Sequence, residues 1–290
     1  MARRVGGWRK LAGSAWGRPM DPQFYGDLEL DAEPLLDYIA RVRQADGVHL
    51  TVTHLVGRAV AHGLAAVPEL QVRLAHGREY DRESVDVFFI VTTGGGNELT
   101  GVKVEAADQK SAVQIATEVT SRCAAISGGS DPELGRGKAL LTTLPPRMLG
   151  AALRLGAWLT SDLNLDLRRL GMPRQAFGGA MITSVGMWGI GHAYSPLAHY
   201  YRVPVLVLVG AVHKAPTVID DAVVIRPMLT LTATFDHRYA DGYHAARFAE
   251  ALRSYCADPA RFESARPPGD EQSQDQVRRA GSGADAPGPA

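Results

Sequence analysis

The chain has 290 residues, of which 46% are hydrophobic and 21% charged, an ordinary composition for a globular protein with a sizeable core. Because 31 basic residues balance 31 acidic ones, no overall charge favours nucleic acid or an anionic membrane as a partner. Cys123 and Cys256 both fall on apolar helix faces, so we expect reduced core residues rather than a disulfide. The N-terminus shows no signal-peptide pattern, and a cytoplasmic protein is the default expectation.

Along the chain, helical and strand patterns alternate, which predicts an α+β fold around a mixed β-sheet flanked by helices. Strands are expected at residues 85–92, around Val102 and Val104, and at residues 203–209, 222–225 and 229–235. Residues 94–97 and 219–222 are predicted turns. The apolar residues at helical spacing are Leu35, Leu36, Ile39 and Val42; then Leu55, Val56, Ala59, Val60, Gly63 and Leu64; and Ala112, Ile115, Ala116, Val119 and Cys123.

Two further stretches stand out. Residues 263–290 are rich in Pro, Gly, Ser, Gln and charged residues, which predicts a disordered C-terminal tail after a folded part at residues 1–262. Residues 148–159 form an apolar run that is too short and too charged to span a bilayer. A packed surface helix is the simplest interpretation. The open alternatives are a membrane-surface contact over residues 145–160, an oligomer contact and a cap over an active site.

The most informative stretch is residues 236–242, because it places His237 and Asp241 four residues apart where a strand gives way to a helix. Loops at such junctions commonly carry chemistry. Two alternatives use the same residues. Asp241 could simply cap the helix, with His237 as a turn residue, or His237, Asp241 and His244 could hold a metal ion, although His237 precedes the helix.

Residues 235–242 resemble the DHRxxDG signature of the catalytic domain in the acyltransferase subunits of 2-oxo acid dehydrogenase complexes, which share the chloramphenicol acetyltransferase-like fold. Residues 182–189 resemble a second segment of that family, and Thr183 precedes His237 by 54 positions, close to the family spacing. The similarity covers roughly residues 20–128 and 178–262. Residues 129–178 are therefore an insertion into a catalytic domain that spans residues 1–262.

The resemblance implies a function and a set of site residues. His237 would be the general base that removes a proton from a CoA thiol, and the Thr183 hydroxyl would stabilise the oxyanion, with Ser184 as the fallback. The carboxylate at Asp241 would pair with an arginine, either Arg9 or Arg18, and hold the catalytic turn. Gly242 would permit a tight start of the helix. CoA would be a substrate, with no metal required.

The resemblance also implies a homotrimer in which His237 of one chain faces Thr183 of its neighbour, and a larger cage is an open extension of it. Nothing in the first twenty residues resembles a lipoyl domain, so no lipoyl attachment is expected in this chain. A lipoyl-bearing or other protein, or a free small molecule, would then be the acyl donor. Residues 101–108 and 200–205 depart from the family pattern, which leaves the acyl specificity open. A non-catalytic trimeric scaffold and a metal-dependent hydrolase are the alternatives.

Overall fold

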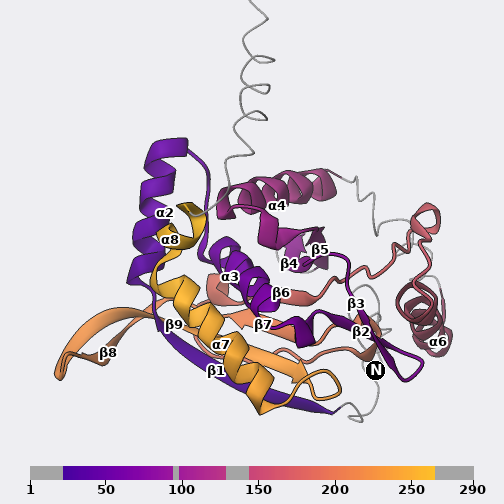
Figure 1. Ribbon diagram of the computed structural model, residues 1–290. Helices are drawn as coiled ribbons and strands as arrows, with labels where there is room; N and C mark the ends of the chain where they lie inside the picture. Colours follow the sequence, from indigo (N-terminus) through magenta and orange to yellow (C-terminus); the bar gives the residue numbers. More distant parts are fainter. Residues whose placement is uncertain (1–21, 94–97, 129–143, 265–290) are drawn as a thin grey trace, which may run out of the picture.

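A seven-stranded mixed sheet forms the centre of the molecule in a computed structural model that describes residues 22–93, 98–128 and 144–264 (Figure 1). The strand order is β1-β9-β7-β6-β4-β5, and β8 pairs with β9 outside this path. β6 runs parallel to β4 and β7, while the remaining pairs are antiparallel. The strands are β1 (Gln23–Asp31), β4 (Val87–Thr93), β5 (Glu98–Val104), β6 (Ala180–Ser184), β7 (Val205–Val209), β8 (His213–Ile219) and β9 (Ala222–Asp236). The predicted mixed sheet is confirmed.

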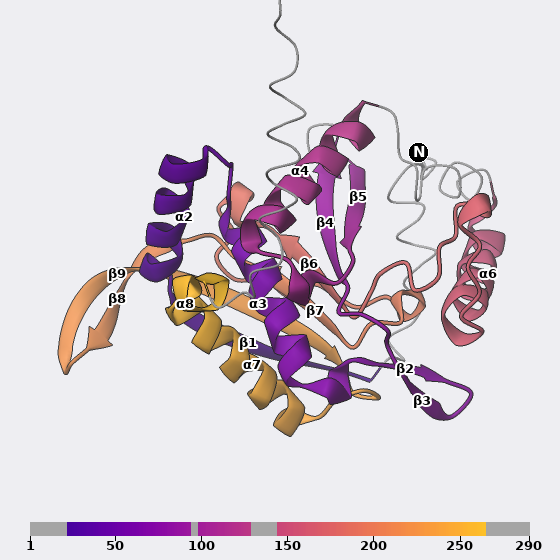
Figure 2. The ribbon, with the colours of Figure 1, turned by 45° about the horizontal axis from the view of Figure 1, so that its top comes forward.

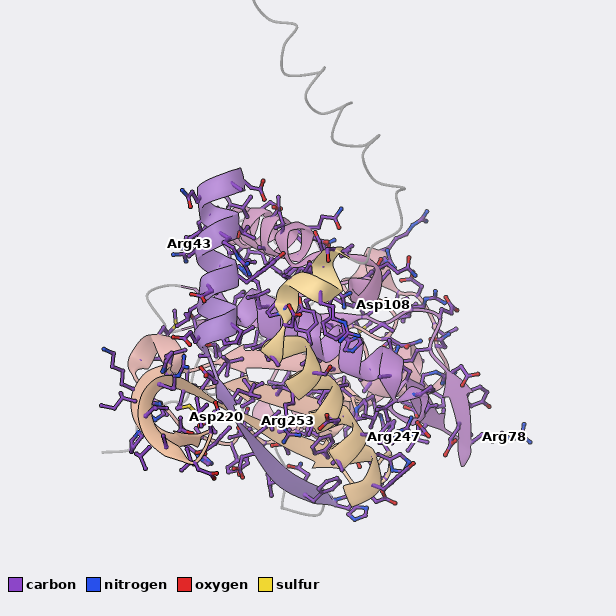
Figure 3. All side chains as sticks on the ribbon, turned by 60° about the vertical axis from the view of Figure 1, so that its left-hand side comes forward. Arg43, Arg78, Asp108, Asp220, Arg247 and Arg253 are labelled. Atoms are coloured by element: carbon purple, nitrogen blue, oxygen red, sulfur yellow. The ribbon has the colours of Figure 1, made fainter. Side chains whose placement is uncertain are left out.

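Most of the α-helices in the described ranges gather on one face of this sheet (Figure 1). They are α2 (Glu33–Asp46), α3 (Val52–Ala66), α4 (Ala112–Ser127), α7 (Gly242–Ala257) and α8 (Pro259–Ser264). The side chains of Thr51 and Ser111 cap α3 and α4, which explains where these helices begin. Figure 3 shows α7 from its outer side, with Arg247 and Arg253 labelled on it, and Arg247 reaches the end of α3, where it donates to the Ala66 carbonyl at 3.1 Å. The main core therefore lies between the sheet and the inner side of the helices.

A second, smaller core lies on the opposite face of the sheet. Phe88, Met181 and Leu206 project from β4, β6 and β7 and pack with Leu197, Ala198, Tyr201 and Val203. The chain segment at residues 190–201 crosses this face, where the hydroxyls of Thr232 and Thr234 donate to the carbonyls of Ala193 and Ser195. Because successive side chains of a strand point to opposite faces of the sheet, the same strands contribute to two different cores.

Two parts extend from the body at opposite ends, as Figures 1 and 2 show. One is the β8–β9 arm. At the other end lie helix α6 (Pro146–Ala157) and the small hairpin of β2 (Val72–Ala75) and β3 (Arg78–Asp81). The short helical turns are η1 (Pro68–Leu70), η3 (Ala107–Gln109), η4 (Trp158–Asp162, a π-helix), η5 (Arg168–Leu170), η6 (Gly186–Trp188) and η7 (His199–Tyr201). In the described ranges, every helix is too short or too polar to cross a membrane.

Some sequence predictions need correction. Residues 222–225 and 229–235 are not separate strands, because β9 runs unbroken from Ala222 to Asp236. The predicted tail begins too early. Glu263 lies in α8 and accepts hydrogen bonds from the Tyr255 hydroxyl at 2.7 Å and the Ala112 amide at 2.7 Å. The rest of the predicted tail and the turn at residues 94–97 lie outside the described residues. Both cysteines are free, and burial raises the pKa of Cys256 to about 12.

Candidate active site

The junction between β9 and α7 is a tight turn held by Asp236. Its buried carboxylate pairs with the Arg238 guanidinium, with Nε 2.9 Å from Oδ1 and 3.1 Å from Oδ2, and accepts the Arg238 amide at 3.0 Å. The amides of Tyr239 and Ala240 donate to the Asp236 carbonyl oxygen. A paired charge inside such a turn is costly to disrupt, because removal of one partner leaves the other poorly solvated. Asp236 and Arg238 therefore fix the backbone on both sides of His237.

His237 lies at the surface beside the first strand. Its amide donates to the carbonyl of Pro22 at 2.7 Å, which extends the pairing of β9 with β1 by one more contact. The edge of the imidazole packs against the Phe24 ring with the centroids 5.1 Å apart, and Phe24 stacks in turn on Phe235 at 4.9 Å. Backbone and ring contacts thus orient the imidazole.

Asp241 is the N-cap of α7, as the simpler interpretation of this residue predicts. Its carboxylate accepts hydrogen bonds from the amides of Tyr243 and His244 and contacts the His244 ring at 2.8 Å. Desolvation raises the pKa of Asp241, but these hydrogen bonds outweigh it, so the pKa lies below its ordinary value. The arginines considered as its partners, Arg9 and Arg18, lie outside the described residues.

Gly242 is not required by sterics at the start of this helix. Its φ is not positive, and a Cβ built there meets no heavy atom within 4 Å. The prediction that this glycine permits a tight start of α7 is therefore wrong.

Thr183 lies near the end of β6 on the same sheet face as Met181. The residue is half-buried and forms part of the lining of a cavity of about 250 Å³. Ser184, the fallback, alternates with Thr183 and so projects to the other face of the sheet. This difference favours Thr183 as the hydroxyl that a bound molecule could reach.

Within one chain the structure does not bring His237 and Thr183 together. Thr183 lies beside Leu208, and Leu208 lies beside Thr232 on the next strand. His237 follows Thr232 by five residues, which at about 3.3 Å per residue places it roughly 16 Å further along the sheet. One chain alone therefore has no site that uses both residues.

The alternative of a metal site finds no support in the described ranges. No group of three or more His, Cys, Asp or Glu side chains lies there in positions that could hold an ion. The nearest arrangement in sequence, His237, Asp241 and His244, instead has Asp241 capping the helix and contacting His244.

Sequence reasoning missed Arg82, which joins strand β2 and the residue after η7 to the inserted segment. Its guanidinium donates to the carbonyls of Val72 at 3.2 Å and Arg202 at 2.8 Å and to the Gln175 side chain at 2.6 Å. Desolvation lowers the pKa of Arg82 to about 10, although the nearby Tyr239 and Asp86 oppose it. Arg82 follows the exposed strand β3, and no periodicity in the sequence marks such a residue.

Comparisons with known proteins extend these observations. The family model of the 2-oxoacid dehydrogenases acyltransferase (catalytic domain) matches residues 169–263. The lipoamide acyltransferase component of the branched-chain alpha-keto acid dehydrogenase complex of Pseudomonas putida is 35% identical over 88 residues, covering 30% of this chain and 21% of that protein. The chain thus spans about a fifth of the length of the curated relatives it matches.

Solved structures show the same fold over most of the chain. The dihydrolipoamide acetyltransferase of Azotobacter vinelandii, studied for the role of a serine, a histidine and an asparagine in its catalytic mechanism, is 21% identical, with a TM-score of 0.64. That similarity covers 90% of this chain and 94% of that chain. A chloramphenicol acetyltransferase is 13% identical with a TM-score of 0.51, covering 88% of this chain and 100% of that chain. Residues 169–263 are therefore similar in sequence to the 2-oxoacid dehydrogenases acyltransferase (catalytic domain), and the chain shares the fold of the A. vinelandii enzyme over 90% of its length.

Proposed function

We propose that this protein is a CoA-dependent acyltransferase that exchanges an acyl group between a thioester, of the lipoyl type or another, and CoA. The observation that carries this proposal is the conjunction of an oriented surface histidine, His237, with a family match that spans it. A second support is the order of residue types. In the A. vinelandii enzyme the asparagine follows the histidine by four positions, and Asp241 follows His237 by the same step.

The chemistry follows from what thioester exchange needs. A thiol with a pKa near the cysteine value of about 8.5 is only a few per cent thiolate at neutral pH. A neutral imidazole at His237 removes the thiol proton as sulfur attacks the acyl carbonyl carbon. Negative charge then develops on the carbonyl oxygen, where a hydroxyl donor such as Thr183 stabilises it. Collapse of this intermediate breaks the bond to the leaving sulfur, which regains the proton from the imidazolium.

Asp241 acts in this proposal as a positioning residue rather than as a reacting group. It caps α7 and holds His244, and the same helix follows directly on the turn that carries His237. An amino-terminal cap of this kind stabilises the start of its helix.

The direct test of the proposal is an exchange assay with the purified chain. Acetyl-CoA and dihydrolipoamide are mixed with the protein, and the CoA thiol released is followed by a thiol reagent after the dihydrolipoamide is separated. We expect CoA release and acyl-dihydrolipoamide formation in equal amounts. Absence of exchange with acyl-CoA donors of every chain length would leave the non-catalytic scaffold as the better account.

The separation of His237 and Thr183 in one chain also supports a trimer with sites between chains, as the resemblance implies. The β8–β9 arm carries an apolar face for such an assembly. Val218 lies directly opposite Val223, and Ile225 lies on the same side of the arm, with exposed fractions of 67%, 75% and 74%. Exposed apolar patches of this kind mark association surfaces. A cage of several trimers stays a prediction.

We expect the protein in solution to have the mass of three 31.1 kDa chains, about 93 kDa, in light scattering coupled to size exclusion. Replacing Val223 and Ile225 together by glutamate places charges on the apolar face of the arm and should yield monomers without activity. Glu250→Lys on the outer side of α7 is the matched charge change and should leave the trimer intact. A trimer that survives the arm substitutions would show that the arm is not the contact.

A further inference from the structure

The cavity beside Thr183 is built from three parts of the chain. Its floor is the sheet face opposite the helices, where the apolar side chains of Phe88, Ile90 and Leu206 surround Thr183. A second side is formed by helix α6 and the turn η4 that follows it. The third side comes from residues 171–177 and 195–201. The inserted segment, for which the sequence left several interpretations open, therefore supplies much of the wall.

This wall is fixed to the core by buried polar contacts. Arg73 of β2 is buried and donates to the carbonyls of Ser161 at 2.7 Å and Asp162 at 2.9 Å. The Asp162 carboxylate pairs with Arg202 at 3.0 Å. Because the C-terminal end of η4 is held in this way, this side of the cavity keeps its shape without a ligand, as is usual for small-molecule sites.

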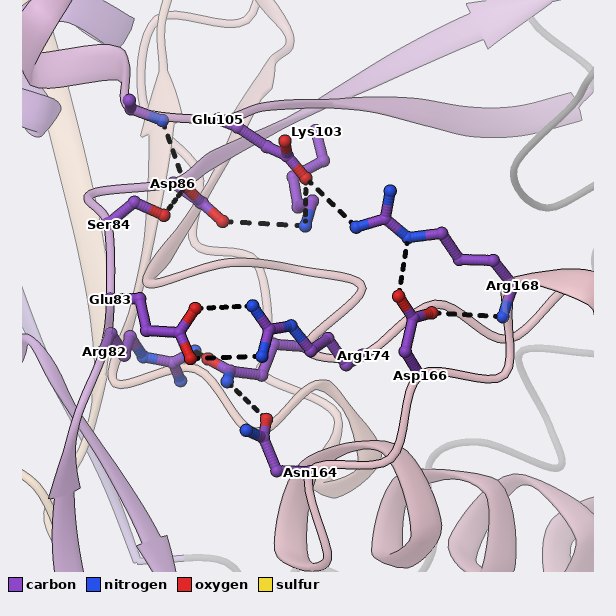
Figure 4. A network of polar contacts seen from close by, with 12 residues as sticks. Arg82, Glu83, Ser84, Asp86, Lys103, Glu105, Asn164, Asp166, Arg168 and Arg174 are labelled. Carbon is purple, nitrogen blue, oxygen red and sulfur yellow. Dashed lines mark hydrogen bonds and ion pairs between the residues drawn. The ribbon is translucent and has the colours of Figure 1, made fainter.

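A second polar network ties the rest of the insertion to the sheet (Figure 4). Asn164 accepts from Gln175 at 2.7 Å, and Gln175 accepts from Arg82. Further along, Arg174 pairs with Glu83, and Arg168 pairs with Asp166 of the insertion and with Glu105, which directly follows β5. The inserted segment is thus a structural part of the fold around the cavity.

The face of α6 that lines the cavity consists mostly of small residues. Ala152 and Gly156 are one helical turn apart, and Ala157 follows. A Cβ built on Gly156 would find only the Met172 sulfur nearby, at 3.5 Å, so larger side chains here would extend into the space that the cavity occupies. The outward residues of the same helix are large, since Met148 and Leu155 are exposed. Small residues on the inner face leave room for a ligand.

The volume indicates the size of that ligand. An apolar cavity of about 150 Å³ holds benzene, with six carbon atoms. By proportion, the 250 Å³ cavity has room for a saturated chain on the order of six to ten carbon atoms. An acetyl group would leave most of this apolar space unfilled, whereas a medium-length chain would bury its methylene groups there.

We infer that this cavity binds the hydrocarbon chain of the acyl group, so that the substrates are thioesters of medium-length fatty acids. The inference rests on the proposed function, because the carbonyl carbon must sit at Thr183 for the attached chain to enter the cavity. The reaction balances as a thioester exchange. The acceptor thiol gives its proton to the departing sulfur by way of His237, one carbon–sulfur bond forms, one breaks, and no oxidant or reductant is involved.

The test compares octanoyl-CoA with acetyl-CoA as donors to dihydrolipoamide. In the intact protein we expect kcat/KM to be at least about tenfold higher for octanoyl-CoA, because methylene groups held in an apolar pocket discriminate by this much or more. Ala152→Phe fills the cavity and should lower the ratio of octanoyl to acetyl kcat/KM at least about tenfold. Ala151→Phe is the matched control. Ala151 is exposed on the same helix outside the cavity, and the ratio should not change.

Binding separates this inference from the proposed function. Calorimetry with His237→Ala measures the affinities of octanoyl-CoA and acetyl-CoA without turnover, and we expect octanoyl-CoA to bind at least about tenfold more tightly. Exchange with equal efficiency for both donors would overturn the inference and leave the proposed function standing. Tight octanoyl-CoA binding without any exchange would keep the cavity assignment and overturn the function. In Ala152→Phe, the ratio of octanoyl to acetyl kcat/KM could stay unchanged while the KM for dihydrolipoamide rises. That result would assign the cavity to the acceptor arm and overturn the inference.

Discussion

Replacing His237 by alanine is expected to lower kcat/KM for acyl exchange by about 10²–10⁴, because the thiol then loses its general base. The effect should appear in kcat, since the imidazole acts on the proton that moves in the transition state. The expected loss applies to every acyl donor, whatever its chain length. Steady-state rates with acetyl-CoA and octanoyl-CoA measure it directly.

The matched control replaces a different exposed histidine by alanine, so that both variants lose one imidazole. His49 is exposed ahead of α3, and His49→Ala should retain full activity. His237→Ala should also keep the trimer mass, because its ring contacts only Phe24 of β1 among the aromatic contacts of the described residues. Activity within about twofold of the intact protein in His237→Ala would rule out general-base catalysis at this residue.

Replacing Thr183 by valine is expected to lower kcat by about 10²–10³, the usual cost of removing one donor to an oxyanion. Valine keeps the branched shape that suits β6, so the strand and the cavity floor should persist. Thr183→Ser retains the hydroxyl and should keep most of the activity. Comparison of the two variants separates the hydroxyl from the packing of the side chain.

A purely structural role for Thr183 would give a different pattern. The two variants would then lose stability in proportion to their lost packing, and serine would be worse than valine because it removes the methyl group of a half-buried side chain. Thermal unfolding of both variants, measured beside their kcat values, distinguishes the two cases. Equal kcat values for valine and serine would remove Thr183 from the mechanism.

Much of the fold could be predicted from local patterns. The alternation of threonines with apolar residues before Asp236 predicts a strand with two different faces, and the structure places Leu229 and Leu231 in the helix-covered core while Thr232 and Thr234 face residues 193–195. The extent of β9 could not be read in this way. Pro227 interrupts the apolar pattern, yet its carbonyl accepts from the Ala32 amide at 2.8 Å, so its missing amide faces a position where the pairing of β9 with β1 has ended.

The candidate site, too, could be predicted only in part from the sequence. His237 and Asp241 are recognisable because one motif carries both, whereas the cavity wall comes from residues of the insertion that are far away in sequence. Ala152 and Gly156 have no distinctive chemistry, and only their position over Thr183 gives them a role. Arg73 and Arg82 are likewise ordinary in sequence, and their hydrogen bonds to carbonyls depend on tertiary contacts. Of the four interpretations of residues 148–159, the lining of the cavity by α6 favours a cap over the active site.

The central claim is that each site takes its histidine from one chain and its threonine from the next. Mixed trimers that contain both His237→Ala and Thr183→Val chains, purified with a different affinity tag on each, test it most directly. In a closed ring of three, one of the three sites then combines an intact His237 with an intact Thr183, so about a third of the activity of the unaltered trimer should return. Mixed trimers as inactive as the two parent variants would contradict a site shared between chains.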